Sequence, residues 1–218
     1  MSVLVAAISA LVAVLHAILV VPRLPEPAEE PLPDDPPKIL YRDLITPRNM
    51  IWLVVGCFIF SFAITELPTA WWPLAVVYIG TGSVLAGIDL LTTYLPLRLN
   101  YLCLVEMVLA STVLFTVGPG AIIRAIAGAV LASAIFWLFW RFSRSLGFGD
   151  VRLAALVGFM GAAISWQHFM MSLLAGTLSG AVFGIAVAIF RKLTNQNQGI
   201  FPYGPSLWLG PIIAIAIS

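Results

Sequence analysis

Long apolar segments separated by short polar ones make up most of the chain. A helix needs about 17 to 25 mostly apolar residues to cross the roughly 30 Å of hydrocarbon in a bilayer. Segments of about this kind lie at 1–21, 49–66, 70–90, 98–117, 120–140, 151–166, 169–190 and 204–218. Strands are not expected, because open sheet edges are not tolerated in lipid and no alternating barrel pattern is present. The pattern predicts an all-α fold, a polytopic membrane helix bundle of about eight transmembrane helices.

Composition supports a membrane protein and excludes several other classes. Hydrophobic residues make up 61% of the chain and charged residues 10%, which is more apolar surface than a soluble core of this size could bury. We therefore expect residues 1–218 to form a single integral-membrane domain in the lipid bilayer. The formal net charge of +1 gives no reason to expect nucleic acid as a partner. Cys57 and Cys103 lie in apolar segments without a CxxC partner, which indicates packing residues and not a disulfide or a metal site.

One long polar segment, residues 22–48, interrupts the apolar pattern. It is rich in proline and contains the acidic residues Glu26, Glu29, Glu30, Asp34 and Asp35. This composition predicts a solvated linker without a core of its own. The segment before it, 1–21, has neither a basic start nor a small-x-small cleavage site, so we expect a retained helix and not a cleaved signal peptide.

The basic residues predict the orientation in the membrane. If the eight segments alternate in direction, the connections after the first, third, fifth and seventh lie on one side. These connections and the adjoining helix ends hold all of the 11 Lys and Arg residues except Arg124. Basic residues accumulate in cytoplasmic loops. The asymmetry predicts that the linker at 22–48 is cytoplasmic and that both termini lie outside.

Two aspartates stand at the edges of apolar segments. Asp89 lies near the end of 70–90, and Asp150 opens 151–166 directly after Gly147, Phe148 and Gly149. A carboxylate at such a position is costly and is expected to find a partner. The alternating topology places both acids at the cytoplasmic edge of the bilayer, where they can meet. Two carboxylates brought together on separate helices are the minimum equipment of an aspartyl protease.

Three motifs resemble those of the type IV prepilin peptidases. The run from Gly147 to Ala154, with Gly158 and Gly161 after it, resembles the family signature GxGD-(V/I)-(K/R)-L-x-A-x-x-G. Asp89 followed by Leu95-Pro96, and the run Pro202-Tyr203-Gly204-Pro205, resemble two further family elements in the same order. Beside the two acids, the resemblance makes site candidates of Gly147, Gly149, Arg152, Pro96, Pro202, Gly204 and Pro205.

The resemblance implies a bacterial inner-membrane aspartyl endopeptidase with Asp89 and Asp150 as its catalytic pair. Such an enzyme removes the short basic leader of type IV prepilins or pseudopilins at the cytoplasmic face and needs neither a metal nor another cofactor. Many family members carry a zinc-holding, cysteine-rich domain between the first two helices, associated with N-methylation of the product. Here that interval contains no cysteine. The resemblance therefore extends to the peptidase and argues against methyltransferase activity.

The other polar and small residues have less specific interpretations. Glu106, inside 98–117, is either a protonated hydrogen-bond partner between helices or a group that supports the two aspartates, and the first role is favoured. His16 has no acid or cysteine at ligand spacing, so a packed or hydrogen-bonded residue is favoured over a metal ligand. The glycines spaced by four, Gly176, Gly180 and Gly184, are typical of close helix packing.

Two other functions remain open at this point. An ion or proton transporter also places acids within a membrane, although it would hold them near the midplane between related halves. An intramembrane protease of the presenilin or signal-peptide-peptidase kind shares the GxGD motif.

For an aspartyl protease, the helix that carries each acid predicts its role. Asp150 at a helix N-terminus is favoured as the base, and Asp89 near a helix C-terminus as the acid.

Overall fold

The computed structural model describes residues 2–26, 39–142, 146–194 and 201–218, and this part of the chain is a helical bundle without strands. The described residues form eight α-helices: α1 Ser2–Leu19, α2 Pro47–Ile64, α3 Trp72–Thr92, α4 Leu97–Ser111, α5 Pro119–Phe142, α6 Phe148–Ile164, α7 Trp166–Leu193 and α8 Gly204–Ala216. The predicted all-α bundle is confirmed, and the helix boundaries fall within three residues of those expected at every end but one. The exception is the segment expected at 98–117, where α4 ends at Ser111 and a 3-10 helix, η4 Thr112–Thr116, follows it. Six of the helical segments in these ranges are long and apolar enough to cross a membrane, so this is a multi-pass membrane protein.

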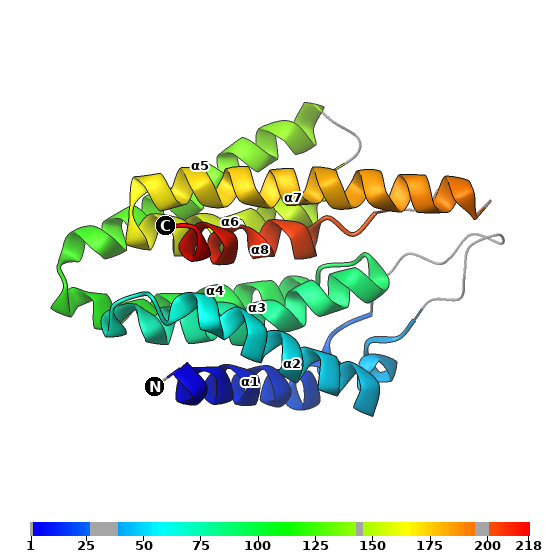
Figure 1. The fold of residues 1–218 in the computed structure, drawn as a ribbon, viewed down its shortest axis with the longest axis horizontal. Coiled ribbons are helices and arrows are strands. Elements are labelled where there is room, and N and C mark those ends of the chain that lie inside the picture. Colours follow the sequence, from blue (N-terminus) through cyan, green and yellow to red (C-terminus); the bar gives the residue numbers. More distant parts are fainter. Residues whose placement is uncertain (1, 27–38, 143–145, 195–200) are drawn as a thin grey trace.

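The helices alternate in direction, as Figure 1 shows. The C-terminal ends of α1, α3, α5 and α7 and the N-terminal ends of α2, α4, α6 and α8 lie on the right of that view, which we call the Gly147 end. Both chain termini lie at the opposite end. The helices α1 to α4 form one half of the bundle and α5 to α8 the other, and α3 contacts both α6 and α8 across the boundary.

The two ends of the polar segment between α1 and α2 pack against the bundle. Short 3-10 helices, η1 at Val21–Arg23 and η2 at Tyr41–Leu44, contact each other. Tyr41 is buried, and its backbone N–H donates to Oε1 of Glu26 at 2.8 Å. Residues 27–38 lie outside the described ranges, so the solvated linker stays a prediction for that part.

Glycines allow the closest helix contacts. A Cβ at Gly176 of α7 would lie 3.0 Å from the carbonyl oxygen of Leu207 in α8, and one at Gly180 would overlap the Tyr203 ring. From the other side, a Cβ at Gly210 of α8 would overlap the carbonyl of Ser172. The contacts at Gly176 and Gly180 agree with the close helix packing predicted for this glycine series.

Arg124, the one basic residue that breaks the charge asymmetry, caps α6. Its guanidinium donates from Nη2 to the carbonyl oxygens of Ala163 and Ile164, at 3.2 and 3.4 Å, and from Nε to that of Ala162 at 3.4 Å. The last carbonyls of a helix have no partner within it, and a cation is favourable at the negative end of the helix dipole. The position of Arg124 therefore has a structural reason, which the charge pattern alone did not supply.

Replacement of Arg124 by Met should lower the free energy of unfolding by about 1 to 3 kcal/mol, because it leaves helix-end carbonyls without a charged donor. Thermal unfolding in detergent would measure the loss. Arg42→Met is the matched control, since Arg42 is exposed and its ion pair with Asp43, at 3.8 Å, is of a kind worth little. Equal stability of the two variants would show that the cap is unimportant.

Candidate active site

Asp89 lies in the last turn of α3, where its side chain meets the start of α8. The residue is 4% exposed, and its Oδ2 accepts a hydrogen bond from the backbone N–H of Gly204 at 2.9 Å. Gly204 is the first residue of α8, so its N–H has no partner within that helix. The hydrogen bond satisfies a free donor of α8 and a buried acceptor of α3 at once, which fixes the Asp89 side chain against α8.

Asp150 lies in the first turn of α6, at the same end of the bundle. Its Oδ2 accepts from the backbone N–H of Gly147 at 3.1 Å, and Gly147 is the residue directly before α6. An acid at the third helical position commonly reaches back to this N–H. The side chain is thus held by its own helix entrance, and Asp150 is 8% exposed.

The start of α8 brings the two acids together. A Cβ at Gly204 would lie 2.6 Å from Oδ2 of Asp89 and 3.3 Å from Cδ2 of Leu153 in α6, so a side chain at this position would displace the Asp89 carboxyl. Leu153 lies three residues after Asp150, so the start of α8 packs against the helices that carry both acids. The two buried carboxyl groups therefore come from separate helices that meet at the start of α8, at the Gly147 end.

Tyr203 is a site residue that the motif comparison left out of the candidate set. It directly precedes α8, beside Gly180 of α7 and Phe136 of α5. Burial, with a smaller contribution from the charge of Asp150, raises the pKa of the Tyr203 phenol to about 12. The phenol is therefore a hydrogen-bond donor at neutral pH, close to the two acids. Its position inside the Pro202-Tyr203-Gly204-Pro205 run was the available signal.

The glycine before Asp150 and the Leu-Pro pair after Asp89 fit together. A Cβ at Gly149 would lie 2.9 Å from Cβ of Leu95, so the connection between α3 and α4 packs directly on the entrance of α6. Pro96 is buried and is the residue before α4. These contacts join two motifs that are far apart in the sequence.

The remaining motif residues lie at the starts of α6 and α8. Pro202 is half-buried before α8, and Pro205 lies in the first turn of that helix. The Arg152 guanidinium lies over the Phe148 ring, 4.7 Å from its centroid. Among the described residues no ion pair joins Arg152 to either aspartate, and the guanidinium instead makes a cation–π contact with Phe148.

Glu106 belongs to a separate polar cluster within the bundle. Its Oε1 lies 2.7 Å from Nε2 of His16 in α1, and its Oε2 accepts from the Thr81 hydroxyl of α3 at 2.6 Å. Thr81 is two turns before Asp89 along α3, about 12 Å at 1.5 Å per residue. This arrangement agrees with hydrogen bonding between helices for Glu106 and with a hydrogen-bonded His16. It gives Glu106 no contact with the two acids.

The hydrogen bonds change the argument for unequal roles of the acids. Asp89 lies near the C-terminus of its own helix, which favours the protonated form, but its carboxyl also faces the N-terminus of α8, which favours the charged form. Asp150 likewise sits at a helix N-terminus. Both carboxyl groups thus accept a backbone N–H at the start of a helix, and the assignment based on α3 and α6 alone loses its basis.

The structure offers no obvious place for a metal ion. Within the described ranges, no three His, Cys, Asp or Glu side chains come together as metal ligands would. Cys57 and Cys103 are buried and unpaired, and Cys57 Sγ lies 3.2 Å from the Ser83 hydroxyl.

Comparisons with known proteins identify the family. The model of the type IV leader peptidase family matches residues 76–185, which is half of the chain and includes both aspartates. No solved structure matches.

Among similar curated proteins, the prepilin leader peptidase/N-methyltransferase of Aeromonas salmonicida is 34% identical over 97 residues, 44% of this chain and 32% of that protein. The protein of the same name from Pseudomonas aeruginosa is 31% identical over 105 residues, 47% of this chain and 34% of its own length. The match thus spans only about a third of these relatives. With half of its length matched by the family model, the chain belongs to the type IV leader peptidase family.

Proposed function

We propose that this protein is an aspartyl endopeptidase that removes the leader of type IV prepilins or pseudopilins at the cytoplasmic face of the bacterial inner membrane. The observation that carries the proposal is the meeting of Asp89 and Asp150 at the start of α8. Family membership and the names of the similar proteins support it. Methyl transfer is not part of the proposal, because the interval between α1 and α2 lacks the cysteines of the zinc-holding domain.

The chemistry needs one proton shared between the two carboxyl groups. Like charges in one buried site do not both ionise easily, so the pair titrates as a unit. The ionised member takes a proton from a water molecule, which attacks the carbonyl carbon of the scissile peptide bond. The protonated member donates its proton to the carbonyl oxygen, which gives a tetrahedral diol. As the C–N bond breaks, the proton taken from water passes to the departing nitrogen, and a hydroxyl of the diol returns its proton to the pair, which restores the shared proton. The Gly204 and Gly147 N–H groups hold the two carboxyl groups in place during these steps.

The depth of the acids favours a peptidase over an ion transporter. Secondary transporters hold their substrate and coupling-ion sites near the membrane midplane, at discontinuous helices. Here Asp89 is in the last turn of α3 and Asp150 in the first turn of α6, so both lie at one end of the bundle. That end is where a peptide emerging from the bilayer would meet them.

Asn at either aspartate should abolish cleavage of a purified prepilin, because neither carboxamide can take up or release the required proton. The loss should reach the assay background for Asp89→Asn and for Asp150→Asn, while both variants still bind prepilin. Mobility shift and N-terminal sequencing of the product provide the measurement. Asp43→Asn is the matched control, an exposed acid outside the site. Near-normal cleavage by either site variant would refute the two-acid mechanism.

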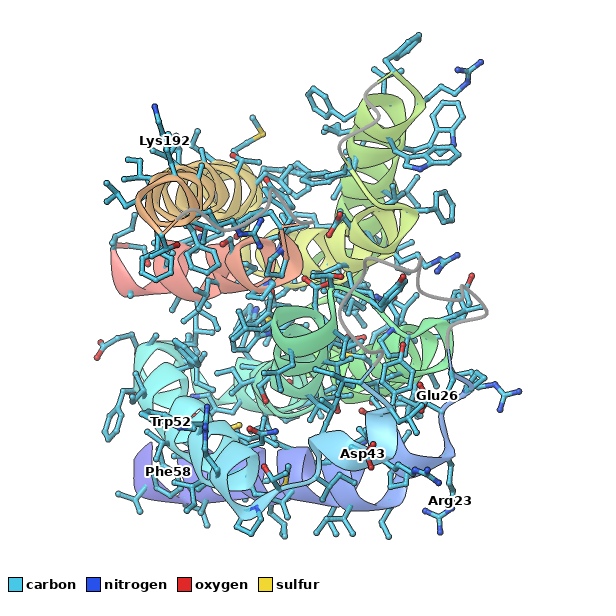
Figure 2. All side chains as sticks on the ribbon, turned by 90° about the vertical axis from the view of Figure 1, so that its right-hand side faces the viewer. Arg23, Glu26, Asp43, Trp52, Phe58 and Lys192 are labelled. Carbon is cyan, nitrogen blue, oxygen red and sulfur yellow. The ribbon has the colours of Figure 1, made fainter. Side chains whose placement is uncertain are left out.

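The proposed orientation places the Gly147 end in the cytoplasm. Figure 2 looks onto this end, with Arg23 and Asp43 at the connection between α1 and α2 and Lys192 at the end of α7. Asp43 is exposed, so a thiol in the variant Asp43→Cys should be reachable from that side alone.

The expected result is no reaction with an impermeant maleimide in intact cells and full reaction after the cells are opened. The buried native cysteines should not react in either case. Labelling of the variant in intact cells would reverse the orientation and separate the acids from the cytoplasm.

A further inference from the structure

An apolar cavity of about 500 Å³ opens between α2, α3 and α8. Trp52 of α2, labelled in Figure 2, and Trp208 of α8 are among its walls. Along α3 it extends from Ser83 to Leu91, and it reaches Pro205, the residue after Gly204. Ile88 and Leu90, the neighbours of Asp89 in sequence, both line it. Asp89 itself faces α8, about 100° around α3 from Ile88. The cavity thus ends beside the turn of α3 that carries Asp89.

Two glycines on facing helices keep this cavity open. A Cβ at Gly87 of α3 would have no heavy atom within 4 Å, and one at Gly56 of α2 would meet only Phe60 of its own helix, at 3.5 Å. Other glycines of α3 differ sharply, since a Cβ at Gly80 would lie 2.7 Å from Val12 and one at Gly82 would lie 2.5 Å from Trp208. At Gly80 and Gly82 the space that a side chain would take is occupied by neighbouring helices. At Gly87 and Gly56 no neighbouring helix of the described chain occupies that space.

We propose that this cavity receives the apolar, membrane-embedded segment of the substrate that adjoins the scissile bond, with its backbone close to Gly87. The proposal rests on the proposed peptidase function. Small residues on a helix surface allow another helix to approach closely in a membrane, whereas a lipid chain needs only apolar walls. Gly87 precedes Asp89 by two residues, about 3 Å along the helix axis. A segment seated on Gly87 can therefore leave the cavity at the Gly147 end and present its next peptide bond to the acids.

Disulfide trapping tests the contact itself. The variant Gly87→Cys, combined with Asp150→Asn to prevent cleavage, is mixed in membranes with prepilins that carry one cysteine stepped along the apolar segment. Mild oxidation should link them at positions that recur every three to four residues. Leu138→Cys on α5 is the control, because Leu138 is 53% exposed and stands four residues before the end of its helix, as Gly87 stands five before the end of α3. No link at Gly87, or equal links at both positions, would overturn the proposal.

Filling the cavity tests its use in catalysis. Gly87→Leu places its Cβ where no heavy atom of the described chain lies within 4 Å, and the rest of the side chain extends into the cavity, so the fold should be kept. We expect kcat/KM on full-length prepilin to fall about tenfold to hundredfold, the effect of losing one well-buried apolar contact, mostly through KM. Gly120→Leu, at an exposed glycine near the start of α5, should leave kcat/KM unchanged. If Gly87→Leu does not fold, Gly87→Ala and the trapping experiment still decide the matter.

The outcomes separate the two proposals. A wild-type protein that cuts prepilin, with Gly87→Leu cutting equally well, overturns the docking proposal and leaves the peptidase intact. A loss of copurifying phospholipid in Gly87→Leu with unchanged cleavage identifies the occupant as lipid, which also overturns it. A wild-type protein that cuts no prepilin refutes the peptidase function and the docking proposal with it.

Discussion

The hydrogen bond from the Gly204 N–H to Asp89 is the contact on which the rest of the site depends. It joins the end of α3 to the start of α8, two helices from opposite halves of the bundle. A hydrogen bond to a charged group is worth about 1.5 to 3 kcal/mol, and an unmatched carboxylate within a membrane costs more than that. The contact therefore fixes the level along α3 at which α8 begins. A Cβ at Gly204 would also lie 3.3 Å from Leu153, so the start of α8 packs on α6 one turn after Asp150.

The helix α6 is held in register by contacts with other elements at both of its ends. At its start, Leu95 packs on Gly149, and at its finish Arg124 of α5 donates to the last carbonyls. In between, its residues are mostly buried among neighbouring helices. In lipid the last carbonyls of a helix need a partner within the protein, so the Arg124 contact is strongly favoured. A helix held at both ends does not slide easily along its axis, which keeps the Asp150 carboxyl at one height in the bundle.

The hydrophobic pattern was sufficient to predict the bundle, and sequence motifs to choose the two acids, because membrane helices and a costly carboxylate both leave strong local signals. Contacts between distant residues left no such signal. Nothing at Asp89 indicated that its partner would be the N–H of Gly204, so its role was judged from α3 alone. The fit of Leu95 on Gly149, the cap by Arg124 and the pairing of Glu106 with His16 depend in the same way on how helices pack. The cavity beside Gly87 is a property of three helices and is invisible in any one of them.

The most direct measurement is disulfide formation between Asp89→Cys and Gly204→Cys in a background with both native cysteines replaced by Ala. A Cβ at Gly204 would lie 3.1 Å from Cγ of Asp89, close to the separation of a Cβ from the sulfur of the partner cysteine in a disulfide. The pair should oxidise readily under mild conditions, as mass spectrometry of the linked peptides would show. Gly87→Cys with Gly204→Cys should stay reduced, because a Cβ at Gly87 faces open space. If the first pair also stayed reduced, α8 would not begin at Asp89, and the two acids would not share a site in the way described.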